Sequence, residues 1–342
     1  MDRASRSTTL QYFIANQNLP ATSPSQMLRR FCLAPSEETQ HWPLEMIRGH
    51  LLEFATDQRA SLWLQEKLTL ECSGKAPQQP CAFEHHHRWV FDELHGRVID
   101  LATTKFGNYI AQHFYKLCSM MQRKIFLAQV QPWMSMLCKD RFGCRIIQTM
   151  LNSGGADAHK SIAATLVSDT VDISNSEFGN HVTQAAITQL LVDRELVIDA
   201  LVENVIPIAM GKYGCKAVKH AYDKLHRYRA NQIAEAIAMH TNEIVNDPHA
   251  NYVWQHIVKI GDPDHRLRLI NLLRADFMSL AMRTFSSWCC QVALEQGDQL
   301  QKTSILKNLF GLDGSFDGPR LAQLAVSRNS GTAFIWLLSM NR

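Results

Sequence analysis

The sequence predicts an all-α fold built from stacked repeats, and three observations carry that prediction. A short cassette of a ring-bearing residue, a small residue and a polar residue recurs down the 342-residue chain. The polar third residue, here called the marker, advances by 35 or 36 residues over five successive steps. The residues around each marker follow helical spacing. A period held this closely is typical of a solenoid in which every repeat presents the same face.

Six copies of the cassette are clear and two are degenerate. The clear markers are Asn108, Cys144, Asn180, Cys215, Asn251 and Ser287. Ser61 lies 47 residues before the first of them, and Thr332 lies 45 residues after the last. The additional residues fall on irregular, turn-rich stretches near 71–84 and 311–319. We therefore count eight repeats, with insertions only at the two ends.

Each marker lies near the start of an expected helix. Four residues before it stands a helix-capping residue type in six repeats: Asp57, Thr104, Asp140, Ser176, Gly211 and Asp247. Arg283 and Arg328 break this pattern in the last two repeats. The residue just before the marker is always small, which predicts close approach of a neighbouring helix. The residue two after the marker is always apolar, which predicts that one face of this helix is buried between repeats.

The marker and the residue four later lie on one helix face. A solvated helix face normally carries Glu and Lys, and Asn is a mediocre helix former, so these polar pairs indicate a role beyond folding. We interpret them as groups that contact the edges of nucleic-acid bases. The pairs are Ser61/Gln65, Asn108/Gln112, Cys144/Gln148, Asn180/Gln184, Cys215/Lys219, Asn251/Gln255 and Ser287/Gln291.

The residue directly after the marker is flat in most of the repeats. Flat side chains flanked by amides are what splayed-out, stacked bases need. The candidate stacking residues are Tyr109, Arg145, His181, Lys216, Tyr252 and Trp288.

These residues resemble the Pumilio/PUF family of RNA-binding repeats over roughly residues 45–342. The motifs Asn-Tyr-x-x-Gln, Cys-Arg-x-x-Gln and Asn-His-x-x-Gln after Phe-Gly carry the resemblance, and residues 48–58 are similar to the family's opening repeat. The resemblance implies a right-handed α-solenoid crescent of about eight three-helix PUF repeats. It also implies that single-stranded RNA binds the concave face, one base per repeat, with the last repeats meeting the 5′ end. Binding to mRNA 3′-untranslated regions, and repressor or deadenylation proteins on the convex face, are further implications.

The donors and acceptors of the pairs agree with the family's base code. An Asn/Gln pair can satisfy the acceptor–donor–acceptor edge of uracil, and a Gln beside a small Cys or Ser can satisfy adenine. Read from the last repeat, the chain predicts the core AUnUAUA. The n reflects Lys219, which has no acceptor and suits guanine O6/N7 or a phosphate.

Two further departures from the family concern the last two repeats. Gln291 stands where the family's guanine-reading repeat has Glu, which predicts adenine at that position. Thr332, Ala333 and Trp336 retain neither the amide nor the stacking residue, so the eighth repeat has no predicted base.

Composition narrows the remaining possibilities. The net charge of +3 agrees with binding by stacking and base edges as well as by phosphates. Nine cysteines without a CxxC motif predict free thiols in a reducing compartment, and no apolar leader or membrane-length apolar run occurs. We expect a cytoplasmic protein without membrane contact, and we expect it to be a monomer. Residues 1–44 are expected to be a partly ordered leader. Cys72, Cys81 and His85–His87 match no zinc motif, so we expect no metal and no cofactor.

Three alternatives stay open on the sequence alone. The first is a nuclear or nucleolar relative that binds structured RNA during ribosome assembly, although such a protein would be expected to have lost the amide code. The second is a protein-binding α-solenoid, which would not need paired amides around a flat residue. The third, an enzyme, has no phosphate loop, zinc signature or nucleophile motif to support it.

Overall fold

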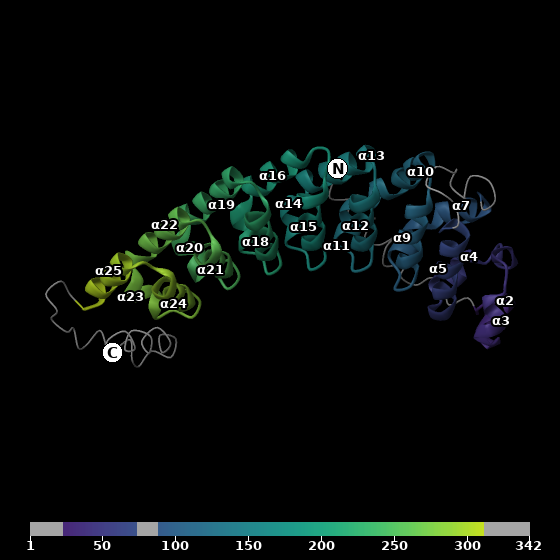
Figure 1. Ribbon diagram of the computed structural model, residues 1–342, viewed down its shortest axis with the longest axis horizontal. Helices are drawn as coiled ribbons and strands as arrows, with labels where there is room; N and C mark the ends of the chain where they lie inside the picture. The colour runs from purple at the N-terminus through teal and green to yellow at the C-terminus, as the bar shows by residue number, and fades with distance from the viewer. Residues whose placement is uncertain (1–22, 74–87, 311–342) are drawn as a thin grey trace, which may run out of the picture. The chain divides into compact units, whose positions relative to one another are not determined.

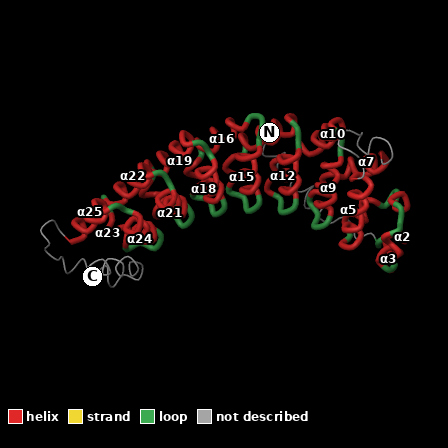
Figure 2. Tube along the Cα trace, viewed as in Figure 1, coloured by secondary structure: helices red, strands yellow, loops and turns green. Residues whose placement is uncertain are grey.

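The computed structural model describes residues 23–73 and 88–310. Helices and loops make up these residues, and no strand occurs among them (Figure 2). No helix in this part of the chain has the length and apolar character needed to cross a membrane. Most of the insertion near 71–84, the insertion at 311–319 and the eighth repeat with Thr332, Ala333 and Trp336 lie outside the described residues.

The repeat consists of a short helix, a longer helix that carries the marker, and an outer helix. In the second repeat these are α8 (Val98–Ala102), α9 (Gly107–Leu117) and α10 (Met120–Val130). We call the marker-bearing helix the code helix. Seven repeats of this plan occur in the described residues, and the architecture is an α-solenoid. The chain divides into two units, Met1–Ile162 and Ala163–Arg342, which are described in turn.

The first unit holds three code helices, α5, α9 and α12, and they contact one another in chain order (Figure 1). Its other helices are α2 (Gln26–Leu33), α3 (Ser36–Gln40), η1 (Leu44–Ile47), α4 (Leu51–Thr56), α7 (Arg88–Leu94), η2 (His95–Arg97), α8, α10, η3 (Gln131–Trp133) and α11 (Met134–Lys139). Code helix α5 spans Gln58–Ser73 and α12 spans Gly143–Ser153. Helix α13 (Ala156–Ser168) crosses the boundary between the units.

The second unit holds four code helices, α15 (Gly179–Gln189), α18 (Gly214–Lys224), α21 (Asn251–Ile260) and α24 (Ser286–Gln296). Each contacts the next one along the chain. Its other helices are α14 (Thr170–Ser174), α16 (Arg194–Glu203), α17 (Val205–Ala209), α19 (Arg227–Met239), α20 (Thr241–Asn246), α22 (Pro263–Arg274), α23 (Phe277–Ala281) and α25 (Gln299–Phe310).

Small residues before the marker let each code helix lie against the short helix that precedes it. A Cβ placed on Gly179 would meet the Ile173 carbonyl oxygen at 2.3 Å, and one on Gly214 would meet the Ile208 carbonyl oxygen at 2.2 Å. Two residues after each marker, the apolar side chain is buried in every described repeat. The predictions of close approach and of a buried face are therefore confirmed.

Capping side chains fix the turn before the code helix in several repeats. Asp140 Oδ1 accepts hydrogen bonds from the backbone N–H groups of Phe142 and Gly143, at 2.9 and 2.6 Å. Asp57 and Asp247 make the same pair of bonds in their own repeats. Thr104 differs from the prediction, because its hydroxyl donates to the Leu101 carbonyl instead.

An aromatic cluster covers the start of the first repeat. Phe31 of α2 packs against Trp42, Phe54 and Trp63 with ring centroids 5.1–5.5 Å apart. The Arg59 guanidinium donates to the backbone carbonyls of Cys32 and Ala34. A terminal repeat exposes an apolar face that must be covered, and part of the predicted leader, 1–44, covers it here.

Polar contacts link neighbouring repeats beyond the buried core. His113 Nε2 lies 2.7 Å from Thr69 Oγ1, and His256 Nε2 lies 2.8 Å from Asp223 Oδ1. Burial, followed by the charge of Lys116, lowers the pKa of His113 below its ordinary value. Burial, followed by Lys224, lowers the pKa of His220 in the same way.

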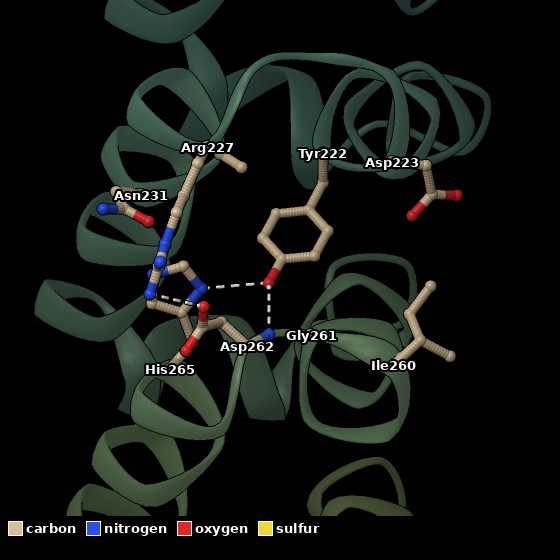
Figure 3. A pocket seen from close by; sticks show the side chains of 9 residues that line it. Tyr222, Asp223, Arg227, Asn231, Ile260, Gly261, Asp262 and His265 are labelled. Atoms are coloured by element: carbon tan, nitrogen blue, oxygen red, sulfur yellow. Dashed lines mark hydrogen bonds and ion pairs between the residues drawn. The ribbon is translucent and has the colours of Figure 1, made fainter.

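Repeats five and six also line an open pocket of about 520 Å³ at the C-terminal ends of α18 and α21 (Figure 3). Inside it the Tyr222 hydroxyl lies 2.9 Å from His265 Nδ1 and accepts a hydrogen bond from the Asp262 backbone N–H. Arg227 forms an ion pair with Asp262 at 2.9 Å. Burial is the main cause that raises the pKa of Tyr222. These bonds join the two repeats at the loops that follow their code helices.

Replacing Gly179 with Ala is expected to lower the free energy of unfolding by about 1–3 kcal/mol, because the new methyl group meets a backbone carbonyl that cannot move freely. Urea denaturation at pH 7 measures this change. Gly155→Ala is the control, since a Cβ there meets nothing within 4 Å. Equal stability of the two variants would contradict the close approach.

Stability is expected to fall as the pH drops below about 6.5, the ordinary pKa of histidine. The folded state holds His113 and His220 neutral, so their contribution is present above that pH and is lost as protonation favours the unfolded chain. The double variant His113→Gln, His220→Gln should lose less stability than the wild type between pH 7 and pH 5. Parallel loss in urea titrations of both proteins would show that other groups are responsible.

Candidate functional site

The marker side chains are buried in all seven described repeats. Their exposed fractions run from 0% for Asn180 to 6% for Cys215. The markers are therefore not part of a solvated helix face. The physical reason is that the marker lies in the first turn of the code helix and folds back onto the turn before it.

Each described marker donates a hydrogen bond to a backbone carbonyl three or four residues earlier. Asn180 Nδ2 donates to the carbonyls of Ser176 and Glu177, at 3.0 and 2.7 Å. Ser287 Oγ donates to Thr284 at 3.1 Å. Ser61, Asn108, Cys144, Cys215 and Asn251 bond in the same way. Asn therefore recurs at this position for a structural reason, its bond to the preceding turn. Helix propensity scales do not account for such a bond.

The glutamine four residues after the marker is half-buried and is oriented by the marker. In the three Asn repeats its Nε2 donates to the marker Oδ1, at 3.1 Å for Gln112, 3.0 Å for Gln184 and 2.9 Å for Gln255. Gln65 and Gln148 donate instead to the backbone carbonyl of their own marker, both at 3.2 Å. The structure thus brings both members of each of these five pairs together on one helix face.

The six predicted stacking residues are all exposed. The exposed fraction is 53% for Tyr109, 55% for Tyr252 and 54% for Trp288. Arg145, His181 and Lys216 are exposed as well. Each lies directly after a buried marker, so a flat or cationic group stands out from every code helix between α9 and α24.

Cations lie against the ring that opens several cassettes. Lys105 is 5.0 Å from the Phe106 ring centroid, and Arg141 is 5.5 Å from that of Phe142. In repeat five two lysines share one ring, with Lys212 5.2 Å and Lys216 5.6 Å from the Tyr213 centroid. These contacts hold positive charge beside the code helices, where it can attract an anionic polymer.

The thiol markers differ from the amide markers in their chemistry. Burial is the main cause that raises the pKa of Cys144 and of Cys215, and nearby cations oppose it only in part. Both thiols are therefore neutral S–H donors to the preceding turn. The sulfur that remains is only a weak acceptor.

Repeat seven departs from the other repeats. Gln291 Nε2 donates to Glu295 Oε1 at 2.7 Å, and Gln291 Oε1 is buried without a hydrogen-bond partner in the described part of the chain. The marker and the residue four later are here called the code pair. The sequence pattern did not identify Glu295, because it lies one turn beyond the code pair of its repeat. It also missed Thr149, whose hydroxyl donates to Gln112 Oε1 in the preceding repeat at 3.2 Å.

No group of three metal-binding side chains occurs within residues 23–73 and 88–310. Cys81 and His85–His87 lie outside the described residues, and the side chain of Cys72 is not described either.

The repeats match a family model described as the Pumilio-family RNA binding repeat, at residues 97–130, 134–163 and 240–274. A Pumilio domain-containing protein of Schizosaccharomyces pombe is 25% identical over 246 residues, which cover 71% of this chain and 34% of that protein. Fem-3 mRNA-binding factor 1 of Caenorhabditis elegans is 25% identical over 272 residues, covering 70% of this chain and 43% of that protein. The chain thus spans less than half the length of these relatives.

Solved structures share the fold. PUF-6 in complex with 5BE13 RNA aligns with a TM-score of 0.75 at 20% identity and covers 87% of this chain and 86% of that one. PUF-8 in complex with PBE-RNA aligns with a TM-score of 0.71 at 22% identity, covering 91% and 87%.

Both the repeat matches and the named relatives agree with the motifs that follow Phe-Gly in this sequence. Together these findings support a place for the chain in the Pumilio/PUF family.

Proposed function

We propose that this chain binds single-stranded RNA in a sequence-specific way, with one base per repeat along the code helices. The observation that carries the proposal is the repeated local geometry. A buried donor, a half-buried amide and an exposed flat or cationic side chain recur at the same positions of successive code helices. A repeating surface of this kind suits a polymer with a repeating, planar unit.

The exposure pattern assigns a different task to each position. The rings of Tyr109, Tyr252 and Trp288 are free to stack on bases, and base–aromatic stacking tolerates any base. Selectivity then comes from the half-buried amides, whose donors and acceptors are partly used by the marker and partly open. Because the marker bond fixes the amide's position, a base meets an edge that is already oriented.

The RNA class that we propose is mRNA, bound through 3′-untranslated regions. Support comes from the name of Fem-3 mRNA-binding factor 1. A solved Puf4 domain bound to the 3′ UTR recognition sequence of HO endonuclease RNA has a TM-score of 0.68 at 21% identity, covering 81% of this chain and 83% of that one. Translational regulation in the cytoplasm, by a monomer that recruits repressor or deadenylation proteins on the face away from the RNA, completes the proposal. No catalytic step is part of it.

The two rival binding functions make different demands on the same surface. A factor that grips structured RNA by shape needs phosphate contacts and no oriented amides. A protein-binding solenoid needs neither the amide pairs nor the exposed rings between them. The Asn/Gln hydrogen bonds of repeats two, four and six favour base reading over both.

The protein is expected to select the core AUnUAUA from a random pool of single-stranded RNA and to bind duplex RNA weakly. Repeats one to four, six and seven each supply one base of this core through their code pairs. Sequencing of the bound pool after selection measures the preference. Enrichment of stems, or of no motif at all, would contradict the proposal.

Tyr252→Ala is expected to weaken RNA binding about 5- to 150-fold, since base stacking on an aromatic side chain contributes about 1–3 kcal/mol. The ring is largely exposed, so the melting temperature should stay nearly unchanged. Tyr228→Ala is the matched control, because Tyr228 is exposed on the outer helix α19. A lower melting temperature with intact affinity would show that Tyr252 is a structural residue, and equal loss of affinity in both variants would show that the RNA lies elsewhere.

A further inference from the structure

Repeats three and five form a natural pair that differs at one base-contacting position. Both have a cysteine marker whose Sγ lies 3.6 Å from the backbone carbonyl three residues earlier. Both follow the marker with an exposed cation, Arg145 or Lys216. The last member of the code pair is Gln148 in repeat three and Lys219 in repeat five. The effect of Lys219 can therefore be judged against repeat three.

The Lys219 ammonium is available to a ligand. No described residue forms a hydrogen bond or an ion pair with it, although the side chain is half-buried. Asp223 lies one turn further along α18, but its carboxylate is bonded to His256. Two further lysines of the repeat, Lys212 and Lys216, lie over the Tyr213 ring.

The base-contacting groups of repeat five are consequently strong donors without a strong acceptor. Lys219 offers N–H donors and no acceptor, whereas the Gln148 amide offers both. The Cys215 proton is used by the Lys212 carbonyl, so the marker adds only a weak sulfur acceptor. A matching base edge must place two acceptors side by side within reach of one ammonium group.

Among the four bases, the Watson–Crick edge of cytosine meets that demand. Its N3 and O2 are adjacent acceptors that one ammonium can bridge. Adenine has a single acceptor, N1, beside its amino donor. Uracil separates its two oxygens by the N3–H donor, and guanine sets two donors beside O6. We propose that repeat five selects cytosine through Lys219, which makes the preferred core AUCUAUA.

This inference rests on the proposed function, and it replaces guanine and a phosphate, the two partners of Lys219 that the sequence alone suggested. Guanine could offer O6 and N7 only if its base were turned over relative to bases read by the neighbouring amide pairs. A phosphate would be met more readily by the exposed Lys212 and Lys216 than by the half-buried Lys219. The half-buried position of Lys219 therefore favours contact with a base edge. The base would present this edge in the same way as the bases of the adjacent repeats.

The test is the affinity of the full chain for four RNAs, AUAUAUA, AUCUAUA, AUGUAUA and AUUUAUA, compared at one salt concentration and then measured over a series of salt concentrations. The wild type should bind the cytosine RNA about tenfold or more tightly than the others, since each mismatched buried polar group is strongly unfavourable. Lys219→Gln converts the pair to that of repeat three and should move the preference to adenine. The reciprocal change Gln148→Lys should move the preference of repeat three from adenine to cytosine, measured on RNAs that differ only at its own position.

The outcomes separate this inference from the proposed function. Failure to bind any of the four RNAs would overturn both. Equal affinity for all four, with a weaker salt dependence in Lys219→Gln, would identify a phosphate contact and overturn the cytosine assignment alone. A preference for guanine would overturn it as well. Thermal unfolding of both variants checks that they are folded, and either variant suffices for the base-preference measurement.

Discussion

The hydrogen bond from the buried marker to the preceding turn is the constraint on which the rest of the repeat depends. A buried donor without a partner would cost about 1–3 kcal/mol in every repeat. Only a short side chain with a donor can reach that carbonyl from the first turn of the code helix, and Asn, Ser and Cys meet the requirement. The residue after the marker is exposed and the residue two after it is buried, because successive side chains point to different sides of the code helix.

This constraint also prepares the surface for its proposed ligand. The Asn markers use Nδ2 for the fold and leave Oδ1 to orient the glutamine of the same pair. One side chain thus contributes to folding and to the position of the group proposed to read a base. The Ser61 and Cys144 side chains do not hold the amide in this way, and Gln65 and Gln148 donate to the helix backbone instead. The amide thus bonds to the marker side chain in the repeats predicted to read uracil. It bonds to the helix backbone in repeats one and three, which are predicted to read adenine.

Much of this architecture could be predicted from the sequence, because a fixed period repeats each physical requirement. The helical fold, the close approach at Gly179 and Gly214 and the burial two residues after the marker all follow from residue type and spacing. The burial of the markers could not be predicted from helix propensity, which contains no term for a bond to the preceding turn. Two interactions occur only once in the described residues: the packing of Phe31 on the first repeat and the Gln291–Glu295 hydrogen bond. They leave no periodic pattern in the sequence and could not be predicted from it.

The central claim is that each exposed side chain after a marker meets one defined base. A photoreactive uracil placed singly in the AUnUAUA core, at the position assigned to Asn251 and Gln255, tests this claim most directly. Crosslinking followed by mass spectrometry of the peptides should place the adduct on Tyr252 or its neighbours on α21. Moving the photoreactive uracil to the position assigned to Asn180 and Gln184 should move the adduct to His181 on α15. Adducts on the outer helices, or adducts that stay in one place when the uracil moves, would contradict the account.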